Sequence, residues 1–128
     1  MQNNQKKRVL VVEDDSSIRN ILADKINYDD DLFASTANDG EEGLAVSIRE
    51  KPDLILLDVI MPKMNGLKML QKLREDPWGK TVPVILLSND DDPEHIRNAL
   101  QDDVTDYLVK SDFELENIVK KIKEILII

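Results

Sequence analysis

The sequence predicts an α/β domain in which a five-stranded parallel sheet carries helices on both faces. Short apolar, β-branched runs alternate with amphipathic stretches, and five such pairs occupy most of the 128 residues. The expected strands are continuously apolar, which is typical of strands buried on both faces. A strand-then-helix order repeated along one chain favours parallel strands joined by crossover helices.

The first half of the chain contains two of these pairs. The run 9–12 predicts a buried strand, and Asp15 follows as the expected N-cap of a helix with apolar residues at helical spacing over 18–26. A weaker strand is expected at 32–36. The helix after it is expected to end before Pro52, because the residue preceding a proline disfavours the helical conformation.

The second half contains the other three pairs. Strands are expected at 54–57, 83–87 and 107–109. The helices that follow them are expected around 67–73, from an N-cap at Asp92-Pro93, and from a capping box at 111–114 to the end of the chain. We therefore expect one domain over 1–128, with a poorly ordered tail at 1–7 and no room for an output domain.

The charge balance limits the partners that the protein can bind. Seventeen Lys and Arg residues oppose 26 Asp and Glu residues, for a net charge of −9. Such a surplus repels phosphate backbones and anionic lipids, which argues against direct binding to nucleic acid or to a membrane. The chain has no cysteine, and its apolar runs of about four residues are too short for a signal peptide or a spanning helix. These features predict a cytoplasmic protein.

Charged and polar side chains follow four of the predicted strands. Glu13 and Asp14 follow the first, Asp58 the third, Ser88 the fourth and Lys110 the fifth. In a parallel sheet these positions converge on one rim, where three carboxylates would repel one another unless one is protonated or a cation lies among them. Oxygen ligands of this kind suit Mg²⁺, or Mn²⁺ in its place. A carboxylate beside a divalent cation and a lysine is suited to accept a phosphoryl group.

The motifs at these positions resemble the receiver domain of two-component response regulators, specifically the stand-alone type related to chemotaxis regulators. They are VVEDD at 11–15, LDVIMPKMNG at 57–66, Ser88, and YLVK at 107–110. The resemblance extends from Arg8 to the last predicted helix. It implies a flavodoxin-like (βα)₅ fold with the strand order 2-1-3-4-5.

The resemblance also implies a function as a phosphorylation-dependent signalling switch. A sensor histidine kinase or a histidine phosphotransferase would donate the phosphoryl group from its phosphohistidine to Asp58. The domain would catalyse only its own phosphorylation and dephosphorylation, so it would not be an enzyme acting on a separate substrate. Its output would be contact with a downstream protein target or onward transfer in a phosphorelay.

The resemblance assigns a role to each residue of the rim. Asp14, Asp58 and the backbone carbonyl of Ile60 would bind Mg²⁺ directly, and Glu13 would bind it through water. Lys110 would pair with Asp58 or with the phosphoryl oxygens.

Two further functions are implied away from the metal. Ser88 would contact the phosphoryl group on activation, and Tyr107 would turn inward as the switch. Ile18 and Ile21, on the first helix, would remain partly exposed for docking of the phosphodonor.

Two residues depart from the pattern of the family. Ser111 stands where a proline usually follows the lysine, and a cis peptide bond costs about 3–4 kcal/mol before serine against about 0.5–1 before proline. The bond at 110–111 is therefore expected to be either trans or a strained cis bond. Asn89 replaces a commonly small residue beside the phosphorylation site, where it would narrow access or add a hydrogen bond.

These departures leave one alternative open, a phosphorylation-independent pseudo-receiver that acts as a binding adaptor, although all the carboxylates and Lys110 are retained. Two others are disfavoured by the residues present. A flavodoxin-like electron carrier would have its flavin phosphate repelled by the acidic run 13–15. A phosphatase of the haloacid dehalogenase type would need a second aspartate where this chain has Ile60.

Overall fold

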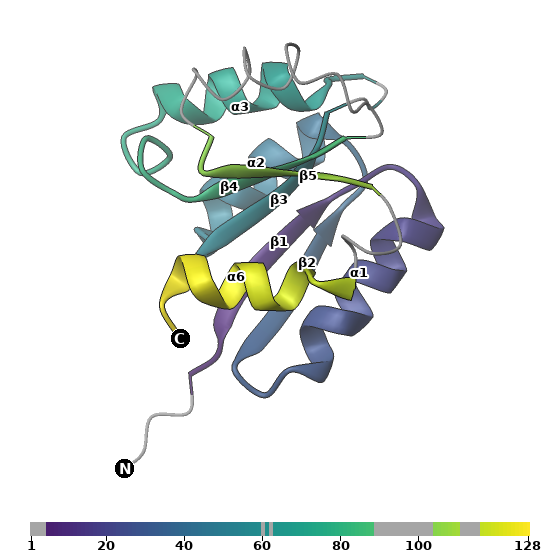
Figure 1. Ribbon diagram of the computed structural model, residues 1–128. Helices are drawn as coiled ribbons and strands as arrows, with labels where there is room; N and C mark the ends of the chain where they lie inside the picture. The colour runs from purple at the N-terminus through teal and green to yellow at the C-terminus, as the bar shows by residue number, and fades with distance from the viewer. Residues whose placement is uncertain (1–4, 60, 62, 89–103, 111–115) are drawn as a thin grey trace.

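A computed structural model describes residues 5–59, 61, 63–88, 104–110 and 116–128. Its five strands form one sheet in the order β2-β1-β3-β4-β5, and all neighbouring strands are parallel (Figure 1). The strands are β1 (Lys7–Val12), β2 (Leu32–Ala37), β3 (Leu54–Asp58), β4 (Val84–Ser88) and β5 (Asp106–Val109). The helices are α1 (Ser16–Tyr28), α2 (Gly40–Glu50), α3 (Gly66–Glu75) and α6 (Ile118–Leu126). The predicted fold class and strand order are confirmed.

Some predictions fall outside the described residues. They concern Ile60, Asn89, the N-cap at Asp92-Pro93, the capping box at 111–114 and the peptide bond at 110–111. These stay predictions. Within the described part of the chain, no helix combines the length and the apolar character needed to cross a membrane.

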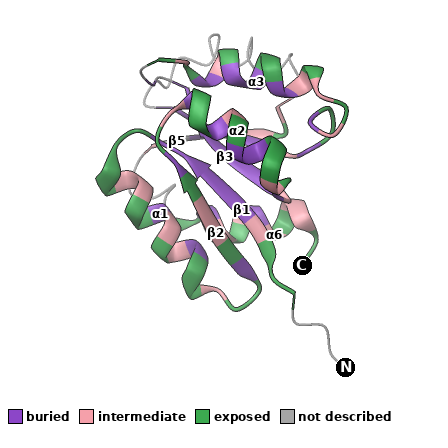
Figure 2. Cartoon of the chain, turned by 180° about the vertical axis from the view of Figure 1, so that it is seen from behind, coloured by how far each residue is buried: buried purple, intermediate pink, exposed green. Residues whose placement is uncertain are grey.

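The central strands β1, β3 and β4 are buried on both faces because alternate residues of these strands pack on opposite sides of the sheet. In β1, Val9 and Val11 face the cluster built with α1 and α6, whereas Leu10 and Val12 face the cluster built with α2 and α3. Figure 2 shows the buried residues concentrated in the sheet and the inner faces of the helices. This two-sided packing explains why the central strands contain unbroken apolar runs.

The first strand begins two residues earlier than the apolar run 9–12 indicates. Lys7 pairs with Leu32, and its backbone N–H donates a hydrogen bond to the carbonyl of Asp31 at 2.9 Å. The backbone partner on β2 thus extends the strand, although the Lys7 side chain is exposed. The predicted tail at 1–7 is corrected at its last residue, which belongs to the sheet.

The chain turns from β3 into α3 through a contact that requires glycine. The Gly66 N–H donates to the carbonyl of Val59 at 2.8 Å. A Cβ at this position would overlap the carbonyl oxygen of Asp58. The glycine therefore lets the start of α3 lie against the end of β3.

Candidate functional site

The polar and charged side chains that were predicted to form the rim lie at the carboxyl ends of the strands. Asp58 and Ser88 are the last residues of β3 and β4, and Lys110 directly follows β5. The Lys110 N–H donates to the Ser88 carbonyl at 2.7 Å, which continues the pairing of β4 with β5 to the rim of the sheet. Parallel strands thus deliver polar groups from distant parts of the sequence to one edge.

Three carboxylates meet at this rim. Glu13, Asp14 and Asp58 each place an oxygen within 4.8 Å of the others, with Glu13 and Asp58 buried and Asp14 exposed. An oxygen-only donor set with one face open to solvent fits a hard divalent cation that retains water ligands. The residues present are therefore compatible with the metal that the sequence predicts.

Lys110 makes ion pairs with two of the three carboxylates. Its Nζ lies 2.7 Å from Oε1 of Glu13 and 3.0 Å from Oδ1 of Asp58. The side chains of all three residues are at most 5% exposed. The predicted contact with Asp58 is observed, and the direct contact with Glu13 is an addition that the sequence did not indicate. One ammonium group thus pairs with two buried carboxylates. When both carboxylates are ionised, the three side chains together carry a net negative charge.

This environment changes how the acidic group titrates. Burial, together with the nearby charge of Glu13, raises the pKa of Asp58 to about 7, although Lys110 partly opposes the shift. Burial alone would lower the pKa of Lys110, but the contacts with Glu13 and Asp58 outweigh it and raise that pKa. The lysine therefore remains charged, and Asp58 is the group that takes up a proton near neutral pH.

The loop that carries Glu13 is held at several points. The Glu13 N–H donates to the carbonyl of Ala37 at 3.1 Å, and Oε2 of Glu13 accepts from the N–H of Asp15 at 3.2 Å. The Asp15 side chain accepts from the backbone N–H groups of Ser17 and Ile18, which confirms it as the N-cap of α1. The cap fixes where α1 begins, and so limits the loop to three acidic residues.

The other predicted residues differ in how exposed they are. Ser88 is buried, and Tyr107 on β5 is 37% exposed. On α1, Ile21 is 45% exposed, whereas Ile18 is half-buried against the cluster on that face of the sheet. Ile21 is thus the more accessible of the two predicted docking residues. The switching and docking roles stay predictions.

Sequence reasoning missed Arg19. Its Nη1 donates to the carbonyl oxygens of Glu13 at 2.9 Å and of Asp14 at 3.4 Å. The only signal in the sequence is an arginine one turn into a helix that follows an acidic loop, and long side chains at such positions usually extend into solvent.

The chain belongs to the response regulator receiver domain family, whose model matches residues 9–123. It is therefore a signal-transduction domain of two-component systems and not a catalytic enzyme, and its acidic pocket is consistent with phosphorylation-dependent signalling. Membership of this family implies a histidine kinase partner.

Individual relatives agree with this assignment. The chain is 39% identical to the probable C4-dicarboxylate response regulator DctR of Bacillus subtilis (strain 168), over 110 residues that make up 85% of this chain and 47% of DctR. It spans about half the length of the first curated relatives that it matches.

Solved structures of similar size also match. Chemotaxis response regulator CheY4 of Vibrio cholerae superimposes with a TM-score of 0.84 at 30% identity, covering 94% of this chain and 98% of CheY4. The Mn²⁺-bound form of response regulator Rcp1 superimposes with a TM-score of 0.80 at 26% identity, covering 92% of each chain. At least one relative of this fold thus binds a divalent cation.

Proposed function

We propose that this receiver domain accepts a phosphoryl group on Asp58 from the phosphohistidine of a sensor histidine kinase or a histidine phosphotransferase. The phosphorylated form then signals to a downstream protein target or passes the group on in a phosphorelay. The observation that carries the proposal is the meeting of Asp58 with two further carboxylates and with a buried Lys110 at one rim.

Asp58 and Lys110 have different roles in this phosphoryl transfer. A carboxylate oxygen of Asp58 attacks phosphorus, the phosphorus–nitrogen bond to the donor histidine breaks, and an acyl phosphate forms on Asp58. Lys110, 3.0 Å from Asp58, is placed to donate to an oxygen of the transferred group. Only the ionised carboxylate is a nucleophile, so the raised pKa of Asp58 favours transfer above neutral pH.

We assign the metal ligands as Asp14 and Asp58, with the carbonyl of Ile60 as a third ligand and Glu13 acting through water. The cation is Mg²⁺, with Mn²⁺ able to replace it, as the Mn²⁺-bound Rcp1 structure suggests by analogy. When bound, a divalent cation neutralises charge on the phosphoryl oxygens. The cluster of three carboxylates and the exposure of Asp14 support this assignment.

We assign the response to phosphorylation to Ser88 and Tyr107. Ser88 ends β4 next to the rim, and Tyr107 lies on the neighbouring strand with 37% of its surface exposed. For the phosphodonor, we propose docking on α1 around Ile18 and Ile21, of which Ile21 offers 45% of its surface.

Phosphorylation by a small donor tests the proposal. In acetyl phosphate and Mg²⁺, we expect intact mass spectrometry to show one added phosphoryl group on the wild-type protein and none on Asp58→Asn. Asp53→Asn is the matched control, because Asp53 directly precedes the same strand at the opposite end and accepts a hydrogen bond from the N–H of Arg8 at 2.8 Å. This control is expected to be phosphorylated like the wild type.

Two results would count against this function. A folded wild-type protein that gains no phosphoryl group would favour the phosphorylation-independent adaptor. A phosphoryl group retained by Asp58→Asn would place the acceptor on another residue.

A further inference from the structure

The loop between β1 and α1 concentrates negative charge. It consists of three consecutive acidic residues, Glu13, Asp14 and Asp15, and it approaches the carboxylate of Asp58. Like charges at these distances repel one another, so the loop needs contacts that keep it in place when no cation is bound.

The N–H groups of the loop account for part of this restraint. Glu13 donates to Ala37 on β2, and Asp15 donates back to the Glu13 side chain. These bonds hold the first and the third residue. Among the described residues, the Asp14 carboxylate has neither a hydrogen bond nor an ion pair, so no side-chain contact sets its direction.

Arg19 supplies the missing restraint through the backbone. Its own N–H donates to the carbonyl of Asp15 at 2.9 Å within the first turn of α1. Its Nη1 then reaches back to the carbonyl oxygens of Glu13 at 2.9 Å and Asp14 at 3.4 Å. The half-buried Arg19 thus spans the loop from the helix that follows it.

These two carbonyl groups belong to the two peptide planes on either side of the Asp14 Cα. Because each peptide unit is planar, holding both carbonyls restricts both φ and ψ of Asp14 and therefore the direction of its Cβ. The guanidinium also brings a fixed positive charge next to an acidic loop, and the two N–H groups of its Nη1 can be donated to two acceptors at once.

We infer that Arg19 is a positioning residue that sets the Asp14 carboxylate for the divalent cation. This inference rests on the proposed function, because it gives Arg19 a role in metal binding without making it a ligand. Residues that orient metal ligands typically change metal affinity by about 10- to 100-fold when they are lost.

The direct test is the affinity for Mn²⁺, followed through the electron paramagnetic resonance signal of the free ion. We expect Arg19→Ala to bind Mn²⁺ about 10-fold more weakly than the wild type. Arg19→Lys should recover part of the loss, since a lysine keeps a positive charge beside the loop but has a shorter side chain and no planar guanidinium.

Arg74→Ala is the matched control. Arg74 also donates through Nη1 to two backbone carbonyls, those of Gly79 at 2.7 Å and Val82 at 2.8 Å, but in the α3–β4 loop away from the acidic pocket. We expect this variant to lose stability against urea while keeping the wild-type affinity for Mn²⁺. A general loss of stability would weaken binding in both variants.

The possible outcomes separate the inference from the function on which it rests. Wild-type affinity in a folded Arg19→Ala variant would overturn the positioning role and leave the metal site intact. An equal loss of affinity in Arg74→Ala would also overturn it. A wild-type protein that binds no Mn²⁺ would instead remove the proposed metal site, and the role of Arg19 with it.

Discussion

Replacing Lys110 with methionine is expected to lower the free energy of unfolding by about 3–5 kcal/mol at pH 8 in the absence of a divalent metal ion. The reason is that the variant leaves the carboxylates of Glu13 and Asp58 buried without the ammonium group that pairs with them. Both lie within 3.0 Å of the Lys110 Nζ, and all three side chains are at most 5% exposed. Urea unfolding in a chelator measures the loss.

The loss should be smaller at pH 5. There Asp58, whose pKa is about 7 in the fold, is protonated, so its ion pair with Lys110 no longer contributes to the difference between the two proteins. Equal losses at pH 5 and pH 8 would show that the ammonium does not stabilise the ionised form of Asp58.

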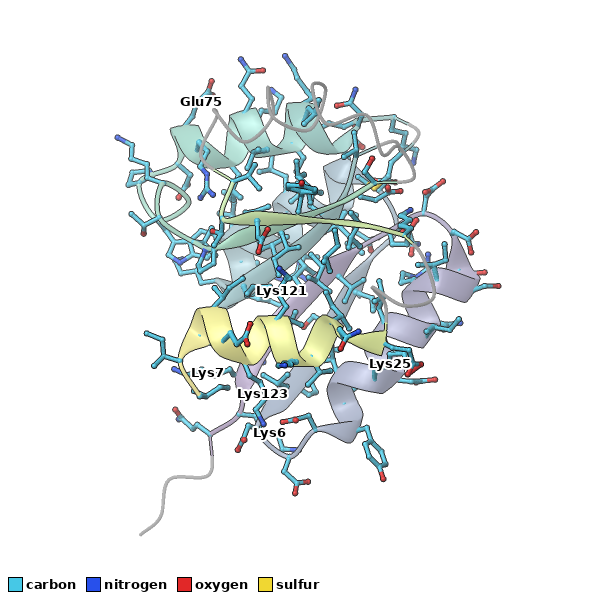
Figure 3. The ribbon with its side chains drawn as sticks, viewed as in Figure 1. Lys6, Lys7, Lys25, Glu75, Lys121 and Lys123 are labelled. Carbon is cyan, nitrogen blue, oxygen red and sulfur yellow. The ribbon has the colours of Figure 1, made fainter. Side chains whose placement is uncertain are left out.

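Lys121→Met is the matched control for this prediction. The side chain of Lys121 extends from α6 toward β5 (Figure 3). Its Nζ is 2.7 Å from Oδ2 of Asp106, the same distance as between Lys110 Nζ and Glu13 Oε1. The two side chains of the control pair are 32% and 36% exposed. Water screens such pairs, so this variant should lose at most about 1 kcal/mol. A comparable loss in both variants would mean that burial does not distinguish the two pairs.

Replacing Asp58 with asparagine is expected to stabilise the protein at pH 8 in the absence of a cation, by about 2–4 kcal/mol. The reason is that the fold holds the pKa of Asp58 at about 7, against 3.8 for the free side chain. The ionised carboxylate is therefore less favourable in the folded protein than in the unfolded chain. Asparagine has nearly the same shape and carries no charge.

The raised pKa of Asp58 determines how the stability gained by Asp58→Asn depends on pH. Between about pH 4 and pH 7 the unfolded chain has released the proton of Asp58 while the folded protein retains it, so the wild type loses stability as the pH rises. The advantage of Asp58→Asn should therefore shrink by about 2 kcal/mol from pH 8 to pH 5. Urea unfolding of both proteins at the two pH values measures it, and a variant less stable than the wild type at pH 8 would contradict the account.

The fold was predictable because its central strands are buried on both faces. Continuous apolar runs such as 9–12 and 54–57 have few other places in a small protein. The start of β1 was not predictable in this way, because Lys7 is charged and exposed and joins the sheet only through backbone bonds with β2. Hydrophobic pattern indicates which segments are buried, and it says little about where backbone pairing stops.

The sequence was enough to predict which residues lie at the ends of the strands and therefore at the site. Knowing that Glu13, Asp58 and Lys110 each lie at the carboxyl end of a parallel strand is enough to place them on one rim. The sharing of one ammonium between two carboxylates depends on side-chain reach and burial, which spacing does not encode. Arg19 was missed for the same reason, since its role depends on a side chain that folds back over the loop before its helix.

The central claim is that carboxylates from separate strands gather a divalent cation beside Lys110, and a Mg²⁺ titration followed by amide NMR tests it most directly. We expect saturable shifts of the amide signals centred on Glu13, Asp14, Asp58 and Lys110. The amide signals of the acidic turn around Asp29 should stay unchanged. This turn lies on another part of the surface, where Nζ of Lys123 is 3.1 Å from Oδ2 of Asp29. Shifts that never saturate, or that are as large around Asp29 as at the rim, would contradict the claim.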